Sequence, residues 1–205
     1  MPQQTLTNQI AAVRAALAKP IDFEDFLVKL GPKGRIHAER HVAVCEAEPD
    51  PRHGAVWRRL ATMLMTLAPH ATKINGQQSV QYFVPDGKYK MQVFALEDLR
   101  DGNISIYCGN ALEDAVKGGV LTPRKKTADT PNVYQVKGTQ EWVSVEELDG
   151  KSPNPAPFYK DMLGWNRKAL RVIVPANATD EQLGAVEGIA AISARKWFLP
   201  AQQPA

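Results

Sequence analysis

Two histidines and a cysteine lie four residues apart in the first quarter of the chain, at His37, His41 and Cys45. On a helix, this spacing places all three side chains along one stripe. Imidazole nitrogens and thiolate sulfur are ligands that zinc prefers, so the stripe predicts a metal site. The alternative is an ordinary helix face with a buried cysteine. The candidates for a fourth ligand are Glu48, His53 and His70.

A second set of residues combines aromatic rings with basic and amide side chains. Its members are Gln81, Phe83, Lys88, Lys90, Phe94 and Tyr107. We expect them on one face of a sheet, where rings can stack on bases and lysines can neutralise phosphates. This predicts a partner face or a weak site for single-stranded nucleic acid. The alternative is that the face packs beneath the N-terminal helices, the 122–157 segment or a second subunit.

A third set is the basic run Arg124, Lys125 and Lys126, which could hold a phosphate or could be a solvated loop. Familiar catalytic patterns are missing from the sequence. Gly118-Gly119 lacks the Walker spacing, and no Gly-x-Ser-x-Gly elbow occurs. The sequence therefore predicts no classical catalytic machinery, although a site assembled from distant residues would leave no such pattern.

Apolar spacing predicts the helices that must position these residues. Leu60, Leu64 and Leu67 belong to an i, i+4, i+7 pattern that indicates an amphipathic helix ending near Pro69. Further helices are expected over 8–18, 21–30 and 35–47, with the second one closed by Gly31-Pro32. Near the C-terminus, Thr179 and Gln182 form a capping-box pattern for a helix that reaches about residue 198.

Two Asp-Gly pairs, at 86–87 and 101–102, predict tight hairpin turns. The first turn would pair residues that are all apolar and would therefore share one face: Val84 with Tyr89, Tyr82 with Met91, and Val80 with Val93. The second turn would add Leu99 with Ile104 and Ala95 with Cys108 to that face. One consistent face from two turns indicates a three-stranded antiparallel meander. More strands are expected at 133–136, 142–145 and 170–174.

Together these elements predict an α+β fold in which the N-terminal helices and a C-terminal helix pack on one face of a roughly six-stranded antiparallel sheet. We expect a single domain over 1–205. It would comprise a helical part over 1–70, a sheet with its helix over 79–198, and a loop-rich insertion over 122–157.

Residues 79–197 resemble small uncharacterised bacterial domains with a frataxin-like α/β sandwich. The resemblance rests on the stretches NISIYCGNALED, ALRVIVP and TDEQLGAVEGIAAISARKW. It implies a sheet covered by a closing helix, and it supplies no catalytic residue. The acidic ridge that frataxins present to iron is missing from the helix over 8–18, which has Arg14 and no acid, so iron handling is not implied.

Composition bounds the function further. The 205 residues are 44% hydrophobic and have a formal net charge of +3, which excludes wholesale disorder and does not favour a nucleic-acid protein. Two cysteines, no apolar run near the ~20 residues of a membrane span and no signal peptide indicate a cytoplasmic protein. We expect a non-enzymatic binding or interaction module, and a homodimer is one form that this expectation allows. The cofactor, if there is one, and the small-molecule or protein partner stay open.

Overall fold

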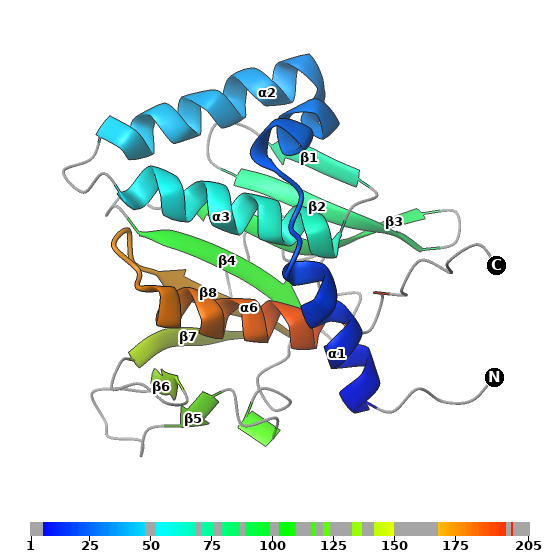
Figure 1. The fold of residues 1–205 in the computed structure, drawn as a ribbon, viewed down its shortest axis with the longest axis vertical. Helices are drawn as coiled ribbons and strands as arrows, with labels where there is room; N and C mark the ends of the chain where they lie inside the picture. The colour runs from blue at the N-terminus through cyan, green and yellow to red at the C-terminus, as the bar shows by residue number, and fades with distance from the viewer. Residues whose placement is uncertain are drawn as a thin grey trace.

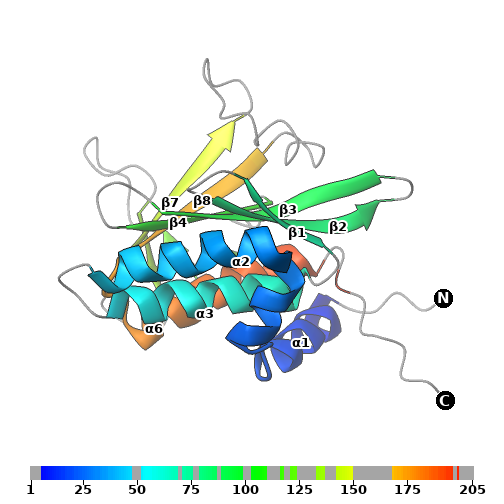
Figure 2. The same cartoon turned by 90° about the horizontal axis from the view of Figure 1, so that it is seen from above.

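The computed structural model describes residues 6–47, 52–68, 71–75, 79–86, 89–98, 103–109, 116–117, 121–123, 133–136, 142–149, 168–195 and 198. These residues form a layer of helices against one antiparallel sheet (Figure 1). Seen from above, the labelled helices all lie on the same side of the sheet (Figure 2). The α+β class and the antiparallel sheet are therefore confirmed. The helices are α1 (Leu6–Leu17), α2 (Phe23–Ala47), α3 (Arg52–Leu67) and α6 (Asp180–Ala194).

The described strands form an eight-stranded sheet in the order β1-β2-β3-β4-β8-β7-β6-β5. The sequence analysis expected about six strands and missed β1 and β5. Both are short, and neither follows a turn signal that the sequence makes visible. The strands are β1 (Ala71–Asn75), β2 (Ser79–Asp86), β3 (Tyr89–Asp98), β4 (Ile104–Gly109), β5 (Leu121–Pro123), β6 (Val133–Val136), β7 (Trp142–Asp149) and β8 (Lys168–Val174).

Helix α2 contains the break that the Gly31-Pro32 pair predicts. Gly31 has φ 71° and ψ 177°, a backbone conformation that is essentially restricted to glycine. Proline at the next position has no N–H and tolerates the start of a new helical turn. Residues 35–47, which hold the histidine stripe, therefore belong to one continuous helical segment after the break.

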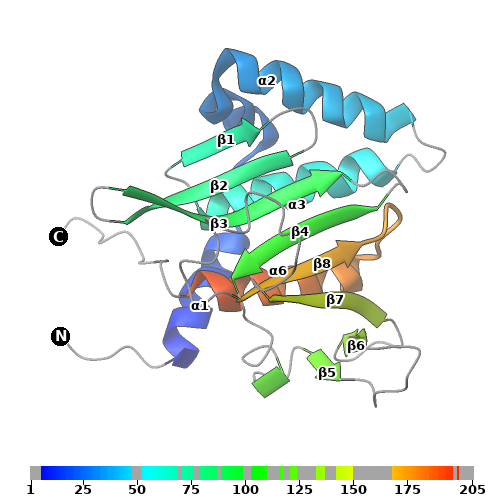
Figure 3. The same ribbon diagram turned by 180° about the vertical axis from the view of Figure 1, so that it is seen from behind.

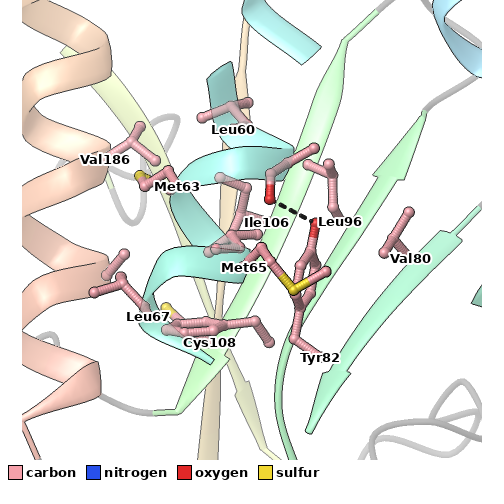
Figure 4. Close-up of a cluster of buried hydrophobic side chains, with 14 of the residues drawn as sticks. Leu60, Met63, Met65, Leu67, Val80, Tyr82, Leu96, Ile106, Cys108 and Val186 are labelled. Carbon is pink, nitrogen blue, oxygen red and sulfur yellow. Dashed lines mark hydrogen bonds between the residues drawn. The ribbon is translucent and has the colours of Figure 1, made fainter. Parts of the chain in front are cut away.

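Helix α3 lies in the middle of the helix layer, between α2 and α6 (Figure 1). It contacts α1, α2 and α6 as well as strands β2 and β3. Trp57, Leu60 and Leu64 on it are each at most 1% exposed. The Tyr82 hydroxyl of β2 donates a hydrogen bond to the Ala61 carbonyl at 3.1 Å, which joins the sheet to α3 through a buried polar contact (Figure 4).

An ion-pair network joins α3 to α6. Arg59 Nη1 lies 2.7 Å from Asp180 Oδ1, and Arg59 Nη2 lies 2.9 Å from Glu187 Oε1. Partial burial lowers the pKa of Arg59, but the hydrogen bonds and charges of Glu187 and Asp180 outweigh it and raise that pKa above its usual value. The capping box of Thr179 and Gln182, present as the sequence predicts, fixes the start of α6 beside this network.

The pairing of β2 with β3 differs from the predicted register. Asp86 pairs with Tyr89, so the turn lies one residue beyond the predicted Asp-Gly position. A bulge between Tyr82 and Phe83 then shifts the pairing again, so that Tyr82 lies opposite Phe94. The prediction that Phe94 lies on the face away from the helices is therefore wrong. Phe94 is fully buried in the hydrophobic core.

The pairing of β3 with β4 is also shifted by one residue from the predicted register. Asp98, not Leu99, pairs with Ile104, and Phe94 lies opposite Cys108. Cys108 is still in the core beside Leu67, because its own alternation with Ile106 places it on the helix side (Figure 4). Alternation therefore predicted the correct face for Cys108 in β4. In β3 the bulge moves Ala95, which was expected on the apolar face with Cys108, to the row of Gln81 and Tyr107 on the other side.

The two glycines at Gly31 and Gly184 should respond in opposite ways to alanine. Gly31→Ala is expected to lower the free energy of unfolding by about 1–3 kcal/mol, because a Cβ is strained at this φ and ψ. Gly184→Ala should raise it by about 0.5–1 kcal/mol, because alanine favours the helix and its Cβ meets nothing within 4 Å. Urea unfolding of both variants measures this, and effects of the same sign would contradict it.

Stability should fall at alkaline pH through two buried core groups. Burial raises the pKa of Cys108 to about 12 and the pKa of Tyr82 well above its usual value. The unfolded chain then loses these protons before the folded chain does. Unfolding is therefore favoured by up to about 1.4 kcal/mol per pH unit for Cys108 as pH rises above about 9.

The comparison of wild type with Cys108→Ala isolates the cysteine. Urea midpoints measured from about pH 8 to about pH 11 should decline less steeply in the variant. Tyr82→Phe should flatten only the upper end of the same profile, since the hydroxyl that ionises is gone. Parallel profiles for all three proteins would show that neither group contributes to the alkaline loss.

Candidate functional site

The face of the sheet that points away from the helices contains a group of polar side chains. Because Tyr82 reaches α3, its neighbours in the β2 alternation point to the opposite side. The register Gln81↔Ala95↔Tyr107↔Arg171 then forms one row across β2, β3, β4 and β8, whose strands are seen from this side in Figure 3. We call the following residues the polar sheet face: Gln81, Gln92, Glu97, Ser105, Tyr107 and Arg171.

Two contacts organise the centre of the polar sheet face. The Tyr107 hydroxyl donates a hydrogen bond to Glu97 Oε2 at 2.7 Å. The guanidinium carbon of Arg171 lies 5.7 Å from the centroid of the Tyr107 ring, within the range of a cation–π contact. A carboxylate, a phenol and a guanidinium are thus held side by side on three neighbouring strands.

Two other members of the polar sheet face have no hydrogen-bond partner among the residues that the structure describes. These groups are the amide nitrogen Nε2 of Gln92 and the hydroxyl of Ser105. Both side chains are buried, at 3% and 0% exposure. A buried polar group without a partner costs about 1–3 kcal/mol, so each one needs an explanation. Each offers a donor, on either side of the Tyr107 row, because Ser105 pairs with Glu97 and Gln92 lies five positions from Glu97 on β3.

The six residues predicted for an aromatic-basic face do not all lie on one face of the sheet in the structure. Gln81 and Tyr107 do lie on the polar sheet face but are buried, at 5% and 3% exposure. Phe83 is partly buried, and Phe94 belongs to the core instead. Lys88 lies outside the described residues, and Lys90 is described only as a position in β3.

The sequence analysis missed Ser105 and Arg171. Their signal was weak, because each lies in a mostly apolar strand, and Arg171 joins the polar sheet face only when β4 pairs with β8. Ser105 then lies opposite both Glu97 and Ile173. A serine or an arginine within an otherwise apolar strand was the one local hint available.

The predicted metal stripe is located on the helical segment of α2 that faces α3. His41 stacks on Trp57 with ring centroids 5.7 Å apart and planes at 13°, and Cys45 is buried. Phe26 meets the same Trp57 edge-on. Within the described part of the chain, no group of three or more His, Cys, Asp or Glu side chains could hold a metal ion. The geometry therefore favours aromatic packing for His41 and gives the metal hypothesis no support.

Other predicted features find no functional geometry. Arg124, Lys125 and Lys126 lie outside the described residues. The large apolar side chains that are exposed are Val28, Ile36 and Val44 on α2, and the homodimer stays a prediction because nothing identifies what would cover them. Among the described helices, none has the length and hydropathy to cross a membrane.

Comparison with protein-family models, with curated proteins and with solved structures finds no match to this chain. The resemblance of residues 79–197 to frataxin-like domains therefore stays a prediction. The function must be inferred from the geometry of the polar sheet face and of the helices behind it.

The contact between Tyr107 and Glu97 predicts a specific loss of stability. Tyr107→Phe removes the donor from a carboxylate that has no other partner among the described residues, so the free energy of unfolding should fall by about 1.5–3 kcal/mol. Tyr82→Phe is the matched control, since its hydroxyl donates to a neutral carbonyl and its loss should cost only about 1 kcal/mol. Urea unfolding at neutral pH compares them. A smaller loss for Tyr107→Phe than for Tyr82→Phe would contradict the assignment.

Proposed function

We propose that this chain is a non-enzymatic binding module that holds a small polar ligand on the polar sheet face. The observation that supports the proposal is the pair of buried, unpartnered groups of Gln92 and Ser105. They lie on the same face as the Tyr107–Glu97 hydrogen bond and Arg171. Proteins tolerate such unpartnered groups at functional sites, where a ligand supplies the missing partners.

The arrangement favours binding over catalysis. A serine nucleophile needs an adjacent base that can take its proton. Glu97, which lies opposite Ser105 in register, already accepts a hydrogen bond from the Tyr107 hydroxyl. The ring of Tyr107 is in turn covered by Arg171. These groups hold one another in place, which suits a preorganised recognition surface.

The chemistry of the unpartnered donors selects the ligand class. The Gln92 amide nitrogen and the Ser105 hydroxyl can both donate, and Arg171 contributes a positive charge. Acceptor oxygens of a carboxylate or a phosphate ester complement this set. The ligand is therefore proposed to be an oxyanion that carries a second acceptor oxygen, since Ser105 and Gln92 lie on either side of the Tyr107 row.

The single-strand nucleic-acid alternative is less well supported. Stacking requires aromatic rings that a base can reach. Tyr107 is almost fully buried beneath Arg171, and Phe94 faces the helices. Only Phe83 of the three predicted aromatics is neither in the core nor almost fully buried.

The proposal predicts that removing either unpartnered group weakens ligand binding without lowering the stability of the protein. Ser105→Ala and Gln92→Met should leave the free energy of unfolding unchanged or raise it by about 1 kcal/mol, because each removes a buried group without a partner. Thr62→Val is the control, because its hydroxyl donates to the Arg58 carbonyl at 2.9 Å and its removal should be destabilising. Urea unfolding of the three variants makes the comparison.

Binding is measured by the thermal shift of the full chain against a panel of small carboxylates and phosphate monoesters. Compounds that raise the melting temperature of the wild type should lose that effect in Ser105→Ala and Gln92→Met. If both variants are destabilised as much as Thr62→Val, the two groups have structural partners and the proposal fails. It also fails if the variants respond to the compounds as the wild type does.

A further inference from the structure

A hollow of about 360 Å³ lies between α1 and α6, on the helix side of the molecule. It is separate from the polar sheet face, which lies on the other side of the sheet (Figures 2 and 3). Its size falls at the lower end of the range for small-molecule sites, ~300–1,000 Å³. The residues that line it are Arg14 and Leu17 of α1, Ala18 directly after α1, and Gly184, Glu187 and Gly188 of α6.

The two charged residues of the hollow differ in their pairing. Glu187 Oε1 accepts from Arg59 Nε at 3.1 Å and from Arg59 Nη2 at 2.9 Å, so Glu187 is held by a cation that it shares with Asp180. Arg14 is exposed and forms no side-chain hydrogen bond or ion pair with any described residue. Arg14 is therefore the charged residue of the lining that no described side chain holds, and the carboxylate of a ligand with one negative charge can pair with it.

The remaining residues that line the hollow are apolar or have no side chain. Gly184 lies in the interior of α6, where glycine costs about 1 kcal/mol relative to alanine. A Cβ added there would meet nothing within 4 Å, so close packing does not explain the glycine. The open space in front of it is part of the hollow, next to Leu17 and Ala18. An apolar group of a ligand can occupy this space.

We infer that the hollow between α1 and α6 binds a small amphiphilic monocarboxylate. The carboxylate pairs with the guanidinium of Arg14, whose planar fork suits two parallel hydrogen bonds. The hydrocarbon part lies over Gly184 and against Leu17. Glu187 at the same hollow is an anion that shares its cation with Asp180, so a dianion such as a phosphate monoester is disfavoured. This separates the site in chemistry, as well as in place, from the polar sheet face.

Hexanoate is the probe for this site. Titration into the ¹⁵N-labelled full chain should shift the amide resonances of Gly184 and Gly188, which appear in the well-separated glycine region of the spectrum. Arg14→Gln should weaken hexanoate binding by about tenfold or more, because a charged hydrogen-bond pair is lost. Gly184→Leu should abolish binding, because the leucine side chain would occupy the hollow.

Two controls separate this site from general charge effects. Arg40→Gln removes another exposed arginine without a described partner, on α2, and should leave the hexanoate affinity unchanged. Hexylammonium has the same chain and the opposite charge, and should not shift the two glycine resonances. Far-UV circular dichroism verifies that Gly184→Leu is folded, and Arg14→Gln tests the same site without a change in α6.

The inference is overturned by any of three results. Hexanoate could shift no resonance of α1 or α6, it could bind Arg14→Gln and Arg40→Gln equally well, or hexylammonium could bind as tightly. None of these results depends on the ligand of the polar sheet face. Failure here would therefore leave the proposed function standing, and failure of the proposed function would leave this site standing.

Discussion

The burial of α3 is the constraint on which the rest of the structure depends. A helix that packs beneath a single sheet normally needs one apolar stripe, but α3 contacts three other helices as well. Its sides are therefore used for different contacts. Trp57 meets the aromatic residues of α2, Ala61 accepts the Tyr82 hydroxyl of the sheet, and Arg59 holds the acids of α6. Because each neighbour is fixed to α3 by a separate contact, the helix layer is organised around it.

A one-sided helix layer has consequences for both candidate sites. The side of the sheet that faces the helices has to be apolar, and it holds Val80, Ile106 and Val172 in the core. The other side is under no such requirement from the described helices, so β2, β3, β4 and β8 can present polar residues there. The hollow has a different origin. It forms where α1 and α6 meet at a glycine, so that two helices in contact still leave room between them.

The sequence predicted the elements better than their pairing. Helices α3 and α6 were found from apolar spacing and from the Thr179 capping box, which are local features. Register is not local, because the turn after Asp86 and the bulge at Tyr82 each change which residues face one another. That is why Phe94 was assigned to the wrong face. The polar sheet face was only partly foreseeable, since Arg171 reaches Tyr107 through a pairing between distant segments.

The place of β8 in the sheet has a consequence for how the chain folds. Strands β1 to β4 pair with their neighbours in sequence, and β5 to β8 do the same, so only the β4–β8 pairing joins the two halves of the sheet. It brings Gly109 beside Ala169, and closing a loop of that length has an entropic cost that grows with the logarithm of the number of residues enclosed. Local hairpins can form early, whereas this ladder must await a long-range encounter. Arg171, on β8, therefore joins the polar sheet face only when this long-range pairing has formed.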